Sequence, residues 1–284
     1  MLTLNFISAR GGILPLAKNE NFWLQGADGM TLASTSISSN TVPTMDGDTV
    51  NNVQANYRAI VLYLEIKPGN NVEDVKRYIM SYVKPKLRGT LKWTQNGREL
   101  QISGIVESIE MPRFSDKCIM QITLHCAQPY WEDIEALVAE ISLYVDMHYF
   151  PAEQGGLAFP ADGIPFGVYD QERTKTFTNH GDVSVGMTIS IRALSTVTNP
   201  VLYDLVTGKY IGVNTTMDAG DDIIITTEKG NKNITKNGEI IVDKIKPGST
   251  WLQIEPGDNE FQINSDDADT SNMYFSITFK RRYV

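Results

Sequence analysis

The feature that most restricts the fold of this chain is an alternation of apolar and polar residues with a period of two. Residues 118–126 read CIMQITLHC, residues 183–191 read VSVGMTISI and residues 273–279 read MYFSITF. Successive side chains of a β-strand leave opposite faces of the sheet, so these segments predict strands with one buried face. We therefore expect a fold that is mainly β.

Strand geometry also restricts the chemistry at the end of the first segment. Cys118 and Cys126 share the apolar parity, whereas His125 has the opposite parity. His125 should therefore face away from Cys126, which excludes a thiolate and base pair. The two cysteines should lie roughly 26 Å apart, too far for a disulfide. We expect Cys126 to be a buried structural residue, and two unpaired cysteines fit synthesis in a reducing compartment.

One helix is expected in the first half of the chain, at about residues 72–83. Val75 and Ile79 fall on one helical face, Asn71 can cap the first turn, and Pro85 ends the helix. The helix should pack its apolar face against the predicted strands.

Two further segments of the first half have contrasting patterns. Residues 89–109 predict a hairpin around Asn96 and Gly97, which tolerate the positive φ of a tight turn. Residues 20–56 are polar and poorly periodic, and a segment of this length in a compact protein is usually functional or disordered. The pattern alone leaves both possibilities open.

The chain is expected to form two domains, residues 1–150 and 151–284. Residues 151–167 are rich in proline and glycine and predict the boundary, while residues 132–151 fit a helix and a strand equally well. Past the boundary, short strands such as residues 222–227 and 238–243 alternate with Gly and Pro turns, which predicts a β-sandwich and disfavours a parallel α/β fold.

Charge argues against several classes of partner. The net charge is −9, and acidic residues outnumber basic ones in both halves, so specific nucleic-acid binding is not expected. No apolar run approaches the length of a membrane span, and the first residues lack the basic region of a signal peptide. We expect neither a membrane partner nor a membrane anchor.

The sequence indicates no catalytic site, no cofactor site and no metal site with a recognisable motif. The histidines at positions 125, 148 and 180 lack zinc-ligand spacing, and no phosphate-binding or dinucleotide-binding loop is present. Asp266, Asp267 and Asp269 could place oxygen ligands around calcium, but a solvated turn is favoured because the segment lacks the glycine and glutamate of an EF-hand loop.

Two other functional classes stay open on the residues alone. Trp251 and Tyr274 could stack on sugars, as in carbohydrate-binding β-sandwiches, although core packing is the commoner role of a lone tryptophan in a strand. An esterase or peptidase would need a nucleophile with a base in reach, and no such pair is indicated.

An ordered series of segments across both halves resembles the phage distal tail protein (Dit) family. In the first half these segments are FWLQGADGMTLAS, MDGDTVNNVQANYRAIVLYLEI, RYIMSYVKPKLRGTLKW, LQISGIVESIEMPRF and ITLHCAQPYW. In the second half they are residues 163–191, 199–211, 215–227, 237–243 and 249–263. The resemblance covers roughly residues 22–280, and it rests on the order and spacing of the segments.

The resemblance implies a fold and a role. It implies an N-terminal β-sandwich or split-barrel-like domain with one packed α-helix, followed by a galectin-like C-terminal β-sandwich. It implies a structural, non-enzymatic protein of the virion that forms a homo-hexameric ring. The expected partners are the major tail tube protein and a tail-associated or tail-tip protein. The alternative is a carbohydrate-binding β-sandwich protein that mediates adhesion to the host surface.

Overall fold

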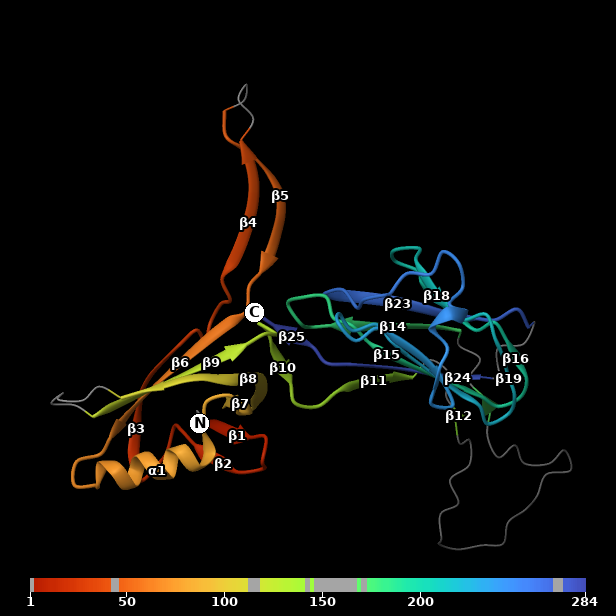
Figure 1. Ribbon diagram of the computed structural model, residues 1–284. Coiled ribbons are helices and arrows are strands. Elements are labelled where there is room, and N and C mark those ends of the chain that lie inside the picture. Colours follow the sequence, from red (N-terminus) through yellow and green to blue (C-terminus); the bar gives the residue numbers. More distant parts are fainter. Residues whose placement is uncertain are drawn as a thin grey trace, which may run out of the picture. The chain divides into compact units, whose positions relative to one another are not determined.

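The computed structural model describes residues 3–41, 46–111, 118–140, 144–145, 168–169, 173–267 and 273–284 (Figure 1). By their internal contacts the residues form two compact units, Met1–Ile134 together with Arg282–Val284, and Glu135–Arg281. The domain boundary predicted between residues 150 and 151 lies outside the described residues and stays a prediction.

The first unit contains the predicted helix and an antiparallel sheet. Its elements are β1 (Thr3–Ser8), β2 (Ile13–Pro15), β3 (Phe22–Asp28), β4 (Thr35–Thr41), β5 (Asp48–Ala55), β6 (Arg58–Ile66), α1 (Val72–Tyr82), β7 (Arg88–Gln95), β8 (Arg98–Glu110), β9 (Ile119–Cys126), β10 (Trp131–Asp133) and β25 (Arg282–Tyr283).

The sheet of the first unit runs in the order β2-β1-β7-β8-β9-β6-β3. The long strand β8 is its branching point, since one edge pairs with β7 while the other edge pairs with β10 and then with β9. β25 pairs with β10 and so returns the end of the chain to this unit. The sheet is therefore open and split at β8 rather than closed into a barrel.

The predicted faces of β9 are confirmed. Met120, Ile122, Leu124 and Cys126 are buried in the core of the first unit, whereas His125 lies on the opposite face and is half-buried. Cys118 differs from expectation, because it precedes the first residue of β9 and is only half-buried.

The predicted helix and hairpin are confirmed as well. Asn71 caps α1 by accepting a hydrogen bond from the N–H of Glu73, and the helix buries Val75 and Ile79 against the sheet core. The turn between β7 and β8 places Asn96 at φ 53° and the residue after it at φ 80°, as a two-residue hairpin turn with positive φ requires.

The second unit is built from short strands. Its elements are β11 (Leu137–Glu140), β12 (Tyr144–Val145), β13 (Val168–Tyr169), β14 (Thr174–Asn179), β15 (Thr188–Ala193), β16 (Val197–Thr198), β17 (Val201–Asp204), β18 (Tyr210–Gly212), β19 (Thr216–Met217), β20 (Asp222–Thr226), β21 (Asn233–Lys236), β22 (Glu239–Ile240), the 3-10 helix η1 (Val242–Lys244), β23 (Gly257–Asn264) and β24 (Met273–Phe279).

Two sheets of the second unit enclose one apolar core. One sheet has the order β11-β24-β15-β20-β21-β22, and the other has the order β14-β23-β17-β18. Ile189 of β15, Phe261 of β23 and Phe275 of β24 are fully buried between them. The predicted β-sandwich is therefore observed, and the fold class is mainly β as expected.

Some boundaries differ from the sequence patterns. The alternation over residues 183–191 yields a strand only from Thr188, with Val185 forming an isolated bridge to Ile254. The segment that fitted a helix and a strand equally well is extended where it is described, since it contains β11 and β12.

Candidate functional site

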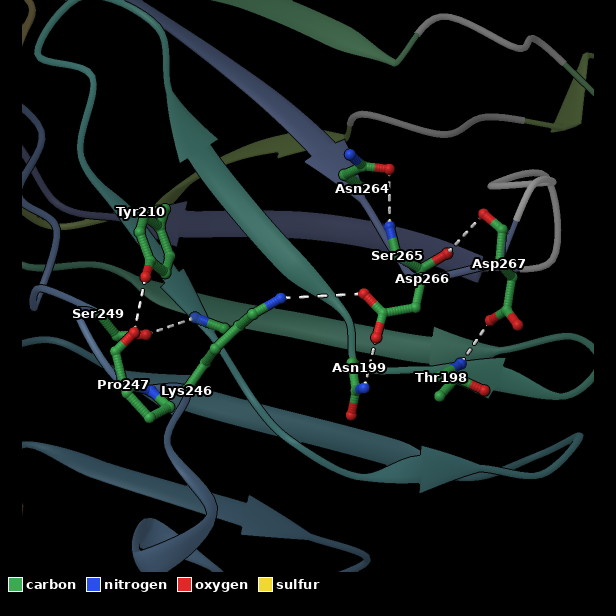
Figure 2. A network of polar contacts seen from close by, with 11 residues as sticks. Thr198, Asn199, Tyr210, Lys246, Pro247, Ser249, Asn264, Ser265, Asp266 and Asp267 are labelled. Atoms are coloured by element: carbon green, nitrogen blue, oxygen red, sulfur yellow. Dashed lines mark hydrogen bonds and ion pairs between the residues drawn. The ribbon is translucent and has the colours of Figure 1, made fainter.

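The acidic residues proposed as a calcium site are engaged in bonds with the chain itself (Figure 2). Asp266 accepts a hydrogen bond from Asn199 at 2.6 Å and lies 3.9 Å from the Nζ atom of Lys246, while Asp267 accepts from the N–H of Thr198 at 2.5 Å. Asp269 lies outside the described residues. Within the described ranges, no group of three or more His, Cys, Asp or Glu residues could hold a metal ion.

The cysteine and histidine at the end of β9 do not form a catalytic pair. Burial raises the pKa of the Cys126 thiol to about 11, an effect that the nearby charge of Arg58 only partly offsets. Cys126 is therefore a neutral thiol at ordinary pH, which makes it a poor nucleophile. His125 stacks on Tyr57 instead, with ring centroids 4.2 Å apart.

The aromatic residues proposed as sugar platforms serve the second unit in other ways. Trp251 is half-buried against the core and lies 5.6 Å from the Nζ atom of Lys232. Burial, together with a hydrogen bond to the Glu140 carboxylate, raises the pKa of Tyr274 to about 12. Both rings therefore have a partner within the second unit.

A different row of polar and aromatic residues crosses the outer face of the second sheet. Thr174 pairs with Gln262, Gln262 with Tyr203, and Tyr203 with Tyr210, whose ring lies 5.5 Å from that of Tyr203. No sequence pattern indicates this row, because its members come from strands far apart in the chain.

The most unusual feature of the first unit is a two-stranded hairpin, β4 paired with β5, which we call the arm. Figure 1 shows both strands projecting away from the sheet to which they are connected. Every residue of β4 and β5 is exposed, and among the described strands the two pair only with each other. An isolated hairpin is marginally stable in water, so this arm lacks the packing that would normally hold it.

The arm has one apolar face. Ile37 lies directly opposite Val53, and Ser39 lies opposite Val50, so all four side chains share a face. The register shifts between Ser38 and Ser39, which leaves Asn51 as the extra residue of a β-bulge. Without this bulge, the spacing of three between Val50 and Val53 would place them on opposite faces.

The opposite face of the arm is entirely polar. It carries Ser36, Ser38, Asn40, Thr49, Asn52 and Gln54. The apolar face is also highly exposed, with exposed fractions of 64% for Ile37, 57% for Val50 and 58% for Val53. A one-sided apolar strand pair with nothing covering it marks a surface for another molecule.

The residues that join the arm to the sheet, Gly29 and Met30 before it and Arg58 after it, form the root of the arm, which is held by hydrogen bonds and close packing. The carbonyl oxygen of Met30 accepts hydrogen bonds from Arg58 Nη1 and from Trp131 Nε1, each at 3.1 Å. Gly29 has φ +76° and lies so close to the backbone of Ala59 that no side chain would fit. The rigid root contrasts with the uncovered strands beyond it.

Arg58 is itself an unusual residue at this root. It is 1% exposed, and its Nε and Nη2 atoms have no hydrogen-bond partner within the described part of the chain. Burial lowers the pKa of the guanidinium, because a charged group is costly to remove from water.

A groove of about 460 Å³ lies on the face of the sheet opposite the core. Its lining includes Ile7, Arg88, Thr90, Ser103, Ile105 and His125, and we call this surface the groove. The strand register explains it, because Arg88 pairs with Ile105 and Ile105 with His125 across β7, β8 and β9. The sequence could not indicate this site, since its lining residues come from four strands and the loop after β9.

The C-terminal part of the chain matches a known family of tail proteins. Residues 180–283 match the family model described as the siphovirus-type tail component, C-terminal domain. This match shows that residues 180–283 are similar to the C-terminal domain of siphovirus-type tail components.

The whole chain has the fold of a distal tail protein. The crystal structure of the Dit protein (gp 19.1) of SPP1 is similar with a TM-score of 0.67 and 13% identity, covering 99% of both chains. Two structures of the phage p2 baseplate in its activated conformation, one with Sr and one with Ca, each show 12% identity, full coverage of both chains and a TM-score of 0.49. The family match over residues 180–283 and the fold of the SPP1 protein bear out the resemblance to the phage distal tail protein family, and the predicted fold class, mainly β, is confirmed.

Two negative findings accompany these matches. No curated protein sequence matches the chain. In the described part of the chain, no helix has the length and apolar character needed to cross a membrane.

Proposed function

We propose that this protein is a structural hub of a phage tail, forming a homo-hexameric ring at the distal end of the tail tube. In this role it connects the major tail tube protein to the tail-associated or tail-tip proteins of the host-adhesion apparatus, and it resides in the virion. The SPP1 protein of the same fold is described as the paradigm of a hub of the adsorption apparatus in phages that infect Gram-positive bacteria. Six copies of 31.7 kDa would weigh about 190 kDa.

The observation that carries the proposal is the arm. It is a hairpin, hydrogen-bonded to its unit where it begins, whose apolar face is covered by none of the residues that the structure describes. Such a strand pair fits a protein that becomes complete only in an assembly, where a neighbouring subunit covers it. We propose that the arm reaches across to the next subunit of the ring.

Catalysis is not part of this role. The Cys126 thiol is neutral at ordinary pH, and His125 faces away from it and stacks on Tyr57. The excess of acidic residues fits a channel that repels rather than holds passing DNA.

Electron microscopy of intact particles tests the proposal. The chain should occupy a six-fold ring at the distal end of the tail tube, in contact with the tube protein on one side and the tail-tip protein on the other. Location anywhere else in the particle would show that the assigned role is wrong.

Carbohydrate binding is a second candidate for the second unit. Its support is the row of Thr174, Gln262, Tyr203 and Tyr210, which gathers hydroxyl, amide and aromatic groups on one sandwich face. A glycan array should then show binding that Tyr203→Ala and Tyr210→Ala abolish. An array without binding would leave the hub as the only role supported.

A further inference from the structure

We propose that the groove is the receptor for the apolar face of the arm of a second copy of this chain. The proposal deepens the hub function and rests on it, because it takes the second copy to be the neighbour in the ring. It specifies which surface of the neighbour the arm contacts, which side chains make the contact, and which face of the arm is involved.

The groove offers an apolar floor with an open top. Ile105 is 38% exposed although it lies in the middle of a row across the sheet, and Tyr57, stacked on His125, is 54% exposed. Ile7 adds a further apolar side chain at the end nearest β1. Ile105 and Tyr57 lie on either side of His125, and exposed apolar residues grouped in this way mark an interaction surface.

The lining of the groove includes two glycines, whose missing side chains would face the core and not the groove. Gly89 and Gly104 are paired across β7 and β8, and their hydrogens point toward Phe6 and Cys126 on the core side. The flanking Thr90 and Ser103 hydroxyls lie 3.1 Å apart and share one hydrogen bond. This bond lowers the cost of covering the two hydroxyls with apolar side chains of the arm.

Charge favours the arm as the occupant. Residues 35–55 contain Asp46 and Asp48 and no Lys or Arg, so the arm carries only negative charge. Arg88 lines the groove, and Lys86 lies beside it in the adjoining pocket together with a single carboxylate, that of Glu107. A segment that carries only negative charge would be attracted to these two cations.

The contact must come from another copy. The arm and the groove both belong to the first unit, yet every residue of the arm is exposed, so the arm does not occupy the groove of its own chain. Strands of seven and eight residues extend roughly 25 Å, which is enough to reach over a neighbour. Because each copy has one arm and one groove, each can donate one contact and receive one, and such head-to-tail contacts close into a ring.

Disulfide trapping tests the proposal with the full-length chain. Val53→Cys and Ile105→Cys are combined in a chain that also carries Cys118→Ser, and the protein is oxidised at high concentration. Both engineered positions are exposed, so folding should be unaffected, which circular dichroism checks. We expect a ladder of disulfide-linked species larger than the dimer. When a chain with only Val53→Cys is mixed with a chain with only Ile105→Cys, we expect dimers alone.

The neighbouring residue supplies a matched control. Asn52→Cys with Ile105→Cys differs by one position along β5 but lies on the polar face of the arm. The Asn52 pair should give at least about tenfold less cross-linked product than the pair of Val53→Cys and Ile105→Cys, called the Val53 pair. Arg88→Glu should lower the yield of the Val53 pair, whereas Arg88→Lys should retain it. Equal yields from the Val53 and Asn52 pairs, or no intermolecular product from the Val53 pair, would overturn the proposal.

The outcomes separate this proposal from the hub function. Six-fold rings without the Val53–Ile105 cross-link would refute the groove as receptor and leave the hub intact. Cross-linking that stops at the dimer in the doubly substituted chain would support the contact and argue against the ring.

Discussion

Replacing Gly89 with alanine should destabilise the first unit, because the new methyl group would enter space that an aromatic ring already fills. The added Cβ would lie 2.5 Å from Cε2 of Phe6, 3.0 Å from Cε1 and closer still to Cζ. Carbon atoms in contact are normally about 3.5–4.0 Å apart, so the ring must move by ~1 Å or more. Phe6 is 1% exposed in a closely packed core and has little room to do so.

Two effects of opposite sign decide the magnitude. Overpacking of this kind costs about 1–3 kcal/mol. Replacing glycine by alanine also restricts the unfolded chain, which stabilises by about 0.4–1 kcal/mol. We therefore expect the free energy of unfolding to fall by about 1–2 kcal/mol.

Urea unfolding followed by tryptophan fluorescence measures the effect, because Trp93 and Trp131 lie 5.8 Å apart in the same unit. Phe6→Leu should cost about 1 kcal/mol alone but relieve the clash in the double variant, giving a favourable coupling of about 1 kcal/mol. Strictly additive effects would refute the packing argument. Since the methyl group points to the core, the outer face and the disulfide trapping of the arm should be unchanged.

Three further outcomes are expected. Val53→Asp should weaken self-association at least ~tenfold in sedimentation velocity, because burial of a valine is worth about 1.5–3 kcal/mol, whereas Asn52→Asp should not; equal losses would contradict the assignment of faces. Cys126 should resist alkylation in the native chain and react in urea, with Cys118 reacting first, and Cys126→Asp should cost about 3 kcal/mol or more; rapid native labelling of Cys126 would contradict its burial. The pKa of Asp221 should lie below the ordinary 3.8, because its lysine partner donates a hydrogen bond at 2.9 Å, so its contribution to stability is present above 3.8 and is lost as the pH falls through the lowered pKa. Replacing Lys236 with methionine should raise the pKa of Asp221, measured by NMR titration of its carboxyl group. An unchanged pKa of Asp221 would rule out the contact.

Local patterns were sufficient for several regular elements of the first unit. The alternation in residues 118–126 predicted which side chains of β9 are buried, and the cap at Asn71 and the turn at Asn96 predicted α1 and the hairpin of β7 and β8. These features depend on neighbours within a few residues, because side-chain direction, capping and turn conformation are properties of the local backbone.

The arm illustrates where local patterns fail. Residues 20–56 have no apolar periodicity, and the bulge at Asn51 hides the fact that Val50 and Val53 share a face. A bulge is a property of two paired strands, so the spacing along one of them does not reveal it. The sequence pattern left open whether this region is functional or disordered, and it did not indicate an amphipathic hairpin.

What the sequence by itself determined is therefore the class of the fold, the faces of its long strands and a resemblance to distal tail proteins. Only the tertiary structure decided the groove, whose Ile7, Arg88, Ile105 and His125 come from different strands, and the pairing of β25 with β10, in which Arg282 bonds a residue 150 positions earlier. The physical reason is that pairing between distant strands is selected by the packing of the whole sheet, and no single segment contains that information.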